Sequence, residues 1–308
     1  MLFNKIVDTI GNTPLVACNN LKKKMGLEAM LYVKVESFNP GGSVKDRIAF
    51  NMLASALEEK DINENTTIIE ATSGNTGIGL ALVCASLNLP CILVMPDTMS
   101  LERRRLIQAY GARLELTPGA KGMMGALERA NELKAEIENS FIPSQFENPQ
   151  NPLAHYTRTG HELLNDLSGE INVFVAGVGT GGTVSGVGKV LKESNPTVEI
   201  VAVEPKDSPM ITEARKGPHK IQGIGAGFIP LNYDPNVVDK VQMVTYDEAK
   251  AAAKLIASTE GILVGVSSGA ALSEAIKIAA NPKYKGKTVV ALLPDTGERY
   301  LSTDLFDE

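Results

Sequence analysis

The chain has few cysteines and histidines, and none of them forms a metal-binding pattern. The three cysteines, Cys18, Cys84 and Cys91, contain no CxxC pair, and the three histidines are not spaced as zinc ligands with one another or with a cysteine. Cys84 and Cys91 lie in apolar segments, which favours reduced thiols in a protein core. The sequence therefore predicts no metal site.

The sequence also lacks long apolar runs and large basic clusters. No apolar segment approaches the roughly 20 residues that span a bilayer, and the N-terminal "MLFNKIVDTIGNTPL" lacks the basic start and apolar core of a signal peptide. The net charge is −6, from 30 basic and 36 acidic residues, and the basic clusters are only "KKK" and "RRR". We therefore expect a cytoplasmic protein that binds neither membranes nor nucleic acid.

The chain does contain a regular alternation of short apolar and amphipathic segments. The first half places predicted helices between the predicted strands "TTIIEA", "PCILVMP" and "ARLELT", and the second half does the same with "INVFVAGVG", "VEIVAVEP" and "KTVVALLPD". This alternation predicts an α/β fold with mainly parallel, twisted sheets covered by helices. The polar, proline-rich "SQFENPQNPLAHY" predicts a domain boundary near residue 150.

Four turns rich in Gly, Ser and Thr lie next to these elements: "NPGGSVKDR", "TSGNTG", "GVGTGGT" and "GVSSG". Ligands of parallel α/β sheets bind where strand ends meet helix N-termini. Each turn alone is weak evidence, but together they predict a single cleft.

The loop "GVGTGGT" (residues 177–183) suits more than one ligand. Its amides, with the hydroxyls of Thr180 and Thr183, suit a phosphate at a helix start. The spacing G-x-G-x-x-G from Gly177, with Glu204 at the end of the next predicted strand, also fits a dinucleotide fingerprint. No lysine lies in the loop, so it is not a Walker motif. The loop alone leaves nucleotide binding, phosphate binding and a tight packing turn open.

Lys45 follows Ser43, the predicted N-cap of a helix whose apolar residues recur at helical spacing. Because the N-terminus of a helix favours anions, the charged form of this lysine is disfavoured and its free amine is favoured. A free amine is what a Schiff base with an aldehyde requires, and together with a phosphate cup it suggests pyridoxal phosphate. The plain alternative is a lysine that extends into water beside Asp46.

The other two turns each have a functional and a structural interpretation. The hydroxyls and amides of "TSGNTG" suit an amino-acid carboxylate, and Asn75 suits a phenolic oxygen, but the turn also fits an ordinary capped helix start. A serine of "GVSSG" suits a pyridine nitrogen or simply forms a small-residue turn. The same turn matches the bare serine-hydrolase pattern GxSxG, yet no strongly placed histidine follows it.

Taken in order, ten segments make the sequence similar to the β-family of pyridoxal-phosphate enzymes (fold type II), and within it to the O-acetylserine sulfhydrylases of the cysteine synthase/cystathionine β-synthase family. The segments are "IGNTPLV", "NPGGSVKDR", "EATSGNTGIGLAL", "MPDTMSLERRRLIQAYGA", "PSQFENPQNPLAHY", "GVGTGGT", "EPKDSP", "GPHKIQGIGAGF", "GVSSGAA" and "DTGERYLST". The similarity covers nearly the whole chain.

The resemblance implies a role for each motif. Lys45 would form the Schiff base, Asn75 would contact the phenolic oxygen of the cofactor, and Ser267 would face its pyridine nitrogen. The implied phosphate loop consists of Gly179, Thr180, Gly181, Gly182 and Thr183. The implied substrate-carboxylate site consists of Thr72, Ser73, Asn75, Thr76 and Gln145.

The resemblance also implies a reaction, a β-replacement through an α-aminoacrylate intermediate. A serine at the pyridine nitrogen cannot hold it protonated by charge, which favours β-elimination, and Val44 and "SGNTG" argue against the related dehydratases and racemases. O-acetyl-L-serine and sulfide would give L-cysteine and acetate. The segment "MITEARK" (residues 210–216) departs from the glycine-rich segment of many relatives. It leaves open L-cysteine as the donor, with release of hydrogen sulfide and formation of L-serine, lanthionine or cystathionine. An NAD-binding oxidoreductase is a distant alternative.

The resemblance finally implies an architecture and partners. We expect a smaller mobile α/β domain, residues 38–150, with the "TSGNTG" loop, and a larger α/β domain, residues 1–37 and 151–308, with the phosphate loop. Pyridoxal 5'-phosphate would lie in the cleft between them. A homodimer is expected, as is an amino-acid substrate with sulfide or a thiol. The C-terminus of serine acetyltransferase is a partner of some relatives.

Overall fold

The computed structural model describes residues 2–307, and its chain divides into two compact units. Unit 1 comprises the described part of Met1–Ile10 together with Lys45–Asn151. Unit 2 comprises Gly11–Val44 and the described part of Pro152–Glu308. The expected functional domains, with boundaries at 37/38 and 150/151, stay a prediction.

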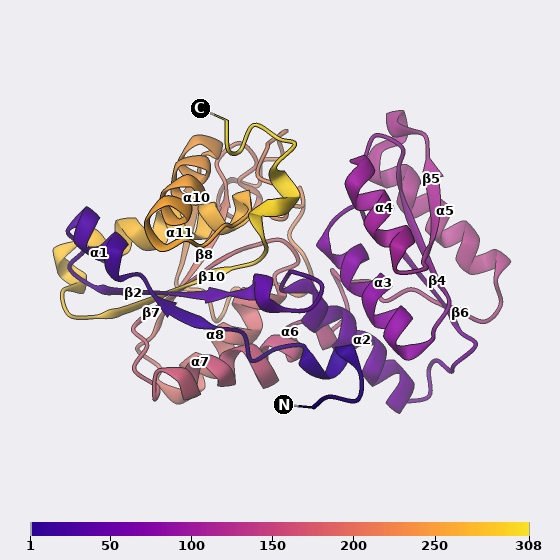
Figure 1. Cartoon of the computed structure of the whole chain (residues 1–308), viewed down its shortest axis with the longest axis horizontal. Coiled ribbons are helices and arrows are strands. Elements are labelled where there is room, and N and C mark those ends of the chain that lie inside the picture. The colour runs from indigo at the N-terminus through magenta and orange to yellow at the C-terminus, as the bar shows by residue number, and fades with distance from the viewer. Residues whose placement is uncertain (1, 308) are drawn as a thin grey trace. The chain divides into compact units, whose positions relative to one another are not determined.

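Unit 2 is built on a six-stranded sheet with the strand order β1-β2-β10-β7-β8-β9 (Figure 1). All neighbouring strands are parallel except β1 and β2, which are antiparallel. The strands are β1 (Leu15–Ala17), β2 (Met30–Val35), β7 (Val173–Gly177), β8 (Glu199–Pro205), β9 (Lys240–Val244) and β10 (Thr288–Leu293).

Helices cover both faces of this sheet. Figure 1 shows α10 and α11 on one side of the strands and α7 and α8 on the other. Successive residues of β7 accordingly alternate between two apolar clusters, with Val173 and Val175 in the cluster of α10 and α11 and Phe174 and Ala176 in that of α7 and α8. The helices are α1 (Asn19–Met25), α6 (Gln150–Ala154, which crosses the boundary between the units), α7 (His161–Asp166), α8 (Gly182–Ser194), α9 (Met210–Glu213), α10 (Tyr246–Glu260) and α11 (Val266–Ala280).

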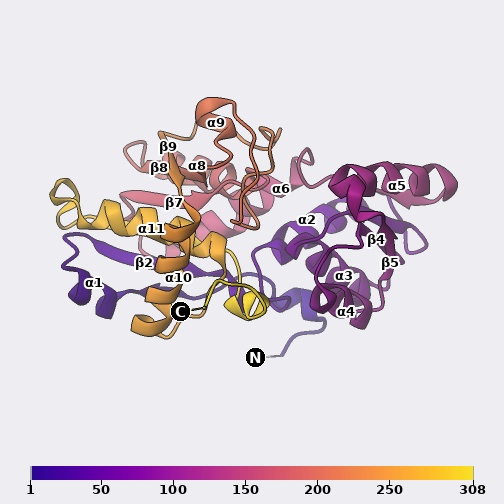
Figure 2. The same ribbon diagram turned by 90° about the horizontal axis from the view of Figure 1, so that it is seen from above.

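Unit 1 is built on a four-stranded, fully parallel sheet with the order β5-β4-β3-β6. Figure 2 shows α5 on one side of β4 and β5, with α3 and α4 on the other. The two faces of β3 and β4 belong to different apolar clusters, one packed against α2 and α3 and one against α5. The elements are α2 (Lys45–Glu58), β3 (Thr67–Ala71), α3 (Asn75–Leu87), β4 (Cys91–Pro96), α4 (Leu101–Ala109), β5 (Arg113–Thr117), α5 (Gly122–Glu136) and β6 (Ser140–Phe141).

The structure confirms the predicted α/β fold class and the six predicted strands. One local prediction is wrong. Helix α2 begins at Lys45, not directly after Ser43, because Ser43 forms an isolated antiparallel bridge with Asp295. Lys45 therefore occupies the first position of α2, inside the first turn where the sequence placed it.

Within residues 2–307, no helix combines the length and the apolar character required to cross a bilayer. Over the same range, no three or more His, Cys, Asp and Glu side chains gather as a group that could hold a metal ion.

Candidate active site

The "TSGNTG" motif forms the turn between β3 and α3 in unit 1. The amide of Thr72 donates to the carbonyl of Val94 in the neighbouring strand β4 at 3.0 Å, and the hydroxyl of Thr72 accepts from the amide of Gly74 at 3.4 Å. Thr72 is buried, whereas Ser73 and Asn75 are half-buried. The turn thus lies at the carboxyl end of a central parallel strand and at the N-terminus of α3, where the helix dipole favours an anion.

The backbone of Lys45 packs against α3, the helix that follows this turn. A Cβ atom at Gly79, one turn after Asn75, would lie 3.1 Å from the carbonyl oxygen of Lys45. Glycine at this position therefore lets the first residue of α2 pack against the second turn of α3. The close approach brings the predicted Schiff-base lysine and the predicted carboxylate loop into one unit and onto adjacent helix starts.

Gln145, predicted from a distant part of the chain, contacts the same turn. The hydroxyl of Thr76 donates to Oε1 of Gln145 at 2.5 Å, and both residues are buried. Nδ2 of Asn151 donates to the carbonyl of Gln145 at 2.7 Å. The structure therefore joins two predicted members of the carboxylate site, Thr76 and Gln145, by a direct hydrogen bond.

A buried carboxylate that sequence reasoning missed lies behind Gln145. Glu70, in β3, accepts hydrogen bonds from the amides of Ser144 and Gln145 at 3.1 and 3.5 Å. Burial raises the pKa of Glu70 to about 7, although the two amides act in the opposite direction. The signal in the sequence was a single acidic residue inside the apolar strand "TTIIEA".

The predicted phosphate loop joins β7 to α8 in unit 2. Gly181, at the N-cap of α8, has φ +82°, and a Cβ atom there would lie 2.7 Å from the amide nitrogen of Tyr233. A Cβ atom at Gly179 would lie 2.3 Å from the carbonyl oxygen of Gly223. Both positions therefore require glycine, and the backbone folds into a tight cradle at the N-terminus of a 13-residue helix.

Ser267 lies next to the same cradle. A Cβ atom at Gly223 would lie 3.3 Å from Oγ of Ser267, and the carbonyl of Gly223 is the group that packs against Gly179. Ser267 is buried in the first turn of α11. The structure thus brings the predicted phosphate loop and the predicted pyridine-nitrogen partner close to the same residue, Gly223.

A histidine also supports the phosphate loop. Nε2 of His155 lies 3.2 Å from the hydroxyl of Thr183, and Nδ1 lies 3.0 Å from the hydroxyl of Thr159. His155 is buried at the start of a π-helix, His155–Gly160. Sequence reasoning had weighed the histidines only as metal ligands, so it missed this contact.

The structure argues against the dinucleotide interpretation of "GVGTGGT". Glu204, the residue that would bind a ribose, is buried. Its two carboxylate oxygens accept from the amides of Ile211 and Thr212 at 2.8 and 3.0 Å. The hydroxyl of Thr212 donates to Glu204 as well, at 2.6 Å. The carboxylate therefore stabilises the start of α9 and is not presented to a ligand of the glycine loop.

The residues of unit 2 fit the phosphate of pyridoxal phosphate. The cradle of Gly179 and Gly181 leaves no room for side chains, two threonines border it, and the N-terminus of α8 favours a dianion. Lys45 of unit 1 stays the predicted source of the amine for the aldehyde. That the two sets of residues meet in one cleft stays a prediction.

Comparison with known proteins identifies the class. The chain belongs to the family described as pyridoxal-phosphate dependent enzyme, which it matches over residues 6–295. It is therefore a pyridoxal-phosphate enzyme, and the distant alternative of an NAD-binding oxidoreductase is wrong.

Within this family, the chain is similar to cysteine synthases and to a hydrogen sulfide-producing enzyme. The chain is 52% identical over 304 residues to cysteine synthase from Staphylococcus aureus (strain Mu50 / ATCC 700699), covering 98% of this chain and 97% of the relative. It is also similar to the crystal structure of cysteine synthase from Entamoeba histolytica, with a TM-score of 0.97, 42% identity, and coverage of 100% and 92% of the two chains. A hydrogen sulfide-producing enzyme from Fusobacterium nucleatum has a TM-score of 0.91, 46% identity, and coverage of 98% and 99%.

Proposed function

We propose that this enzyme catalyses a β-replacement in which O-acetyl-L-serine and sulfide give L-cysteine and acetate. The observation that carries the proposal is the 52% identity to a cysteine synthase over 98% of the chain. The local geometry supports it, because Thr76 and Gln145 are hydrogen-bonded to each other in unit 1 and the predicted phosphate loop forms a tight backbone cradle in unit 2.

The roles of the residues follow from their chemistry. Gly179, Thr180, Gly181, Gly182 and Thr183 would hold the phosphate of the cofactor, and Lys45 its aldehyde. Asn75 would donate to the phenolic oxygen. When bound, pyridoxal phosphate supplies an electron sink that acidifies the Cα proton of an amino acid and lets the β-substituent leave. Ser267 would offer the pyridine nitrogen a neutral hydrogen bond and no negative charge. The electron-withdrawing strength of the ring would therefore stay moderate.

The residues proposed to bind the substrate carboxylate and to transfer the Cα proton all lie in unit 1. Thr72, Ser73, Asn75, Thr76 and Gln145 would bind the carboxylate of the substrate with amides and side-chain donors at the start of α3. The amine of Lys45 would take the proton from Cα and return it there after sulfur has joined Cβ. The packing of α2 against α3 supports these roles, because the backbone of Lys45 contacts α3 at Gly79, one turn after Asn75.

The test is to supply each donor separately and to measure acetate, sulfide and amino-acid products. Rapid acetate release from O-acetyl-L-serine and formation of L-cysteine when sulfide is added, with little sulfide from L-cysteine alone, would support the proposal. Lys45→Ala should abolish turnover while some cofactor still binds. A larger kcat/KM for L-cysteine than for O-acetyl-L-serine would contradict the choice of donor and leave the residue roles intact.

That second outcome defines the alternative, an enzyme that uses L-cysteine, releases hydrogen sulfide and forms L-serine, lanthionine or cystathionine. The sequence of residues 210–216 leaves this alternative open, because it departs from the glycine-rich segment of many relatives. It contains α9, which Glu204 caps, and Arg215 donates to the carbonyls of Lys206 and Asp207. A relative of similar fold is described as hydrogen sulfide-producing.

The assembly is part of the proposal. We expect a cytoplasmic homodimer, which light scattering would show as a mass of twice the 32.8 kDa of the chain. A monomeric mass at micromolar concentration would contradict it. Binding of the C-terminal peptide of serine acetyltransferase is expected by analogy with some relatives, and calorimetric titration with that peptide tests it.

A further inference from the structure

Glu70 is a buried acidic residue in β3, at 4% exposure, to which the proposed reaction assigns no role. A charged group in such a place is costly unless hydrogen bonds compensate it. The contacts of its carboxylate therefore indicate what the residue does.

Both oxygens of Glu70 hold the turn that carries Gln145. Oε2 accepts from the amide of Ser144 at 3.1 Å, and Oε1 accepts from the amide of Gln145 at 3.5 Å. Ser144 has φ +54°, in the left-handed region that a non-glycine residue adopts only when its surroundings impose it. The carboxylate of Glu70 is thus one of the groups that impose this backbone conformation.

Two further hydrogen bonds connect this turn to Thr76 of the predicted carboxylate site. Nδ2 of Asn151 donates to the carbonyl of Gln145 at 2.7 Å, so the backbone of Gln145 is held at its amide and at its carbonyl. Oε1 of Gln145 then accepts from the hydroxyl of Thr76 at 2.5 Å. All of these residues belong to unit 1.

We infer that Glu70 is a positioning residue for substrate binding: by holding the amides of Ser144 and Gln145, it directs the side chain of Gln145 to Thr76 and so shapes the site for the carboxylate of the amino-acid substrate. The inference rests on the proposed function, since it takes Gln145 and Thr76 as carboxylate-binding residues. Glu70 itself does not touch the substrate.

The chemistry explains why a carboxylate is used. A carboxylate offers two acceptor oxygens to two amides, whereas a glutamine in its place offers one oxygen and turns donors toward the other amide. Burial raises the pKa of Glu70 to about 7, so a charged group here carries a cost that a neutral space-filling side chain would avoid. A residue that only filled space would not need to be acidic.

The first test measures how well the amides of the turn around Gln145 are protected, and it does not depend on catalysis. Hydrogen–deuterium exchange of the holoenzyme at pH 8, above the pKa of about 7 of Glu70, is followed by mass spectrometry. It measures the amides within residues 143–149, which are those of Ser144 to Asn148 because Pro143 and Pro149 have none. Glu70→Gln should raise the exchange rate in this segment by about fivefold or more, as expected from the loss of one hydrogen bond. The matched control is Glu248→Gln in unit 2, which removes a carboxylate that accepts from the amide of Thr245 at 2.8 Å and should leave residues 143–149 unchanged.

The second test reads the carboxylate site. Titration of the cofactor absorbance with L-serine and with L-serinamide, which lacks the carboxylate, gives two dissociation constants for each variant. Glu70→Gln should raise the constant for L-serine about tenfold, the size expected for a weakened bond to a charged group, and change that for L-serinamide less than about twofold. With O-acetyl-L-serine, KM should rise by a similar factor while kcat changes less. Glu248→Gln should change none of these values.

Two outcomes would overturn the inference. One is an unchanged exchange rate in residues 143–149 of Glu70→Gln. The other is faster exchange with no selective loss of affinity for L-serine. The tests use Glu70→Gln, which keeps the size of the side chain, because Glu70→Ala would leave a buried space and could fail to fold. A wild-type enzyme that does not convert O-acetyl-L-serine would contradict the proposed reaction, whereas exchange and L-serine binding would still decide the role of Glu70.

Discussion

At the scale of single residues, the glycines of the phosphate loop are required by close backbone contacts. Gly181 combines φ +82° with a Cβ position 2.7 Å from the amide nitrogen of Tyr233. Gly26, at the C-terminus of α1, also has a positive φ, +63°, but a Cβ atom there would meet nothing within 4 Å. A side chain at Gly26 would therefore cause backbone strain alone, whereas a side chain at Gly181 would cause both strain and a steric clash.

This contrast gives a prediction about cofactor binding. Gly181→Ala should displace the loop and abolish or strongly weaken the visible absorbance of bound pyridoxal phosphate. Gly26→Ala should cost only about 1–2 kcal/mol of stability from strain and keep the absorbance. Absorbance spectra and thermal unfolding of both variants provide the measurement. Full cofactor occupancy in Gly181→Ala would show that the loop does not hold the phosphate.

Ser267 gives a second prediction at this scale. The side chain is 3% exposed and lies beside Gly223. Ser267→Ala should lower kcat/KM by about two- to twelvefold, because a neutral hydrogen bond contributes about 0.5–1.5 kcal/mol. Ser267→Asp should do more harm, since it places a carboxylate at a buried position that is proposed to face the ring. Steady-state kinetics with O-acetyl-L-serine test both, and unaltered kinetics in the two variants would place Ser267 away from the ring.

Sequence patterns predicted some of these residues and missed others for a physical reason. Lys45, Gly181 and Ser267 lie at the starts of helices, where a short motif depends on local geometry. Glu70 and His155 act through partners 74 and 28 residues away in the sequence. Contacts of that kind depend on tertiary packing, which a motif within one segment does not encode.

At the scale of elements, the central strands were predictable because both of their faces are buried. "TTIIEA", "PCILVMP" and "INVFVAGVG" read as continuous apolar segments for that reason. The short strands β1 (Leu15–Ala17) and β6 (Ser140–Phe141) were not predicted, since three and two residues are too few to show a pattern. The four-residue helix α9 was missed for the same reason.

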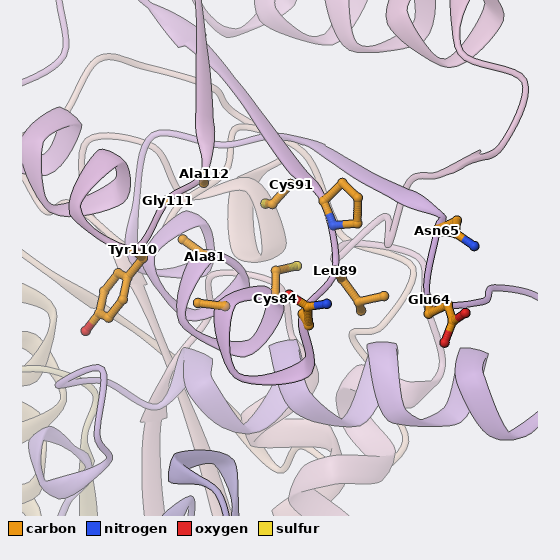
Figure 3. A pocket seen from close by; sticks show the side chains of 12 residues that line it. Glu64, Asn65, Ala81, Cys84, Leu89, Cys91, Tyr110, Gly111 and Ala112 are labelled. Atoms are coloured by element: carbon orange, nitrogen blue, oxygen red, sulfur yellow. The ribbon is translucent and has the colours of Figure 1, made fainter.

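The packing of α3 against β4 gives a third prediction, on thiol reactivity. Figure 3 shows Cys84 of α3 and Cys91 of β4 at a cavity of about 410 Å³. A hydrogen bond with Cys91 and burial raise the pKa of the Cys84 thiol far above its ordinary range, and burial raises the pKa of Cys18 to about 12. All three cysteines are free and buried, as the sequence predicted for Cys84 and Cys91.

Because the thiolate is the reactive form, Cys18 and Cys84 should react with a chromogenic aromatic disulfide at pH 8 no faster than the protein unfolds. Cys91, which is 8% exposed, is shielded by the same packing. The native protein should therefore release little chromophore in minutes, and the three thiols should all react in denaturant. Rapid modification of the native protein would show that the cavity admits the reagent to a thiolate.

At the scale of the whole molecule, the titration of one buried carboxylate should appear in the global stability. Glu70 has an ordinary pKa of 4.5 in the unfolded chain and about 7 in the folded one. Between these values the folded protein binds more protons than the unfolded protein, so the free energy of unfolding falls as pH rises. The stabilisation is complete below pH 4.5 and is lost as pH rises through about 7.

Glu70→Gln removes this titration and leaves the other ionisable groups in place. The difference in unfolding free energy between wild type and Glu70→Gln should therefore move in favour of the variant by up to ~3 kcal/mol between pH 5 and pH 8. Urea unfolding of both proteins at several pH values, at one salt concentration and with saturating cofactor, measures it. Contributions from other groups cancel in the difference. A difference that stays flat over this range would mean that the amides of Ser144 and Gln145 fully offset the burial of the carboxylate, and that Glu70 is charged throughout.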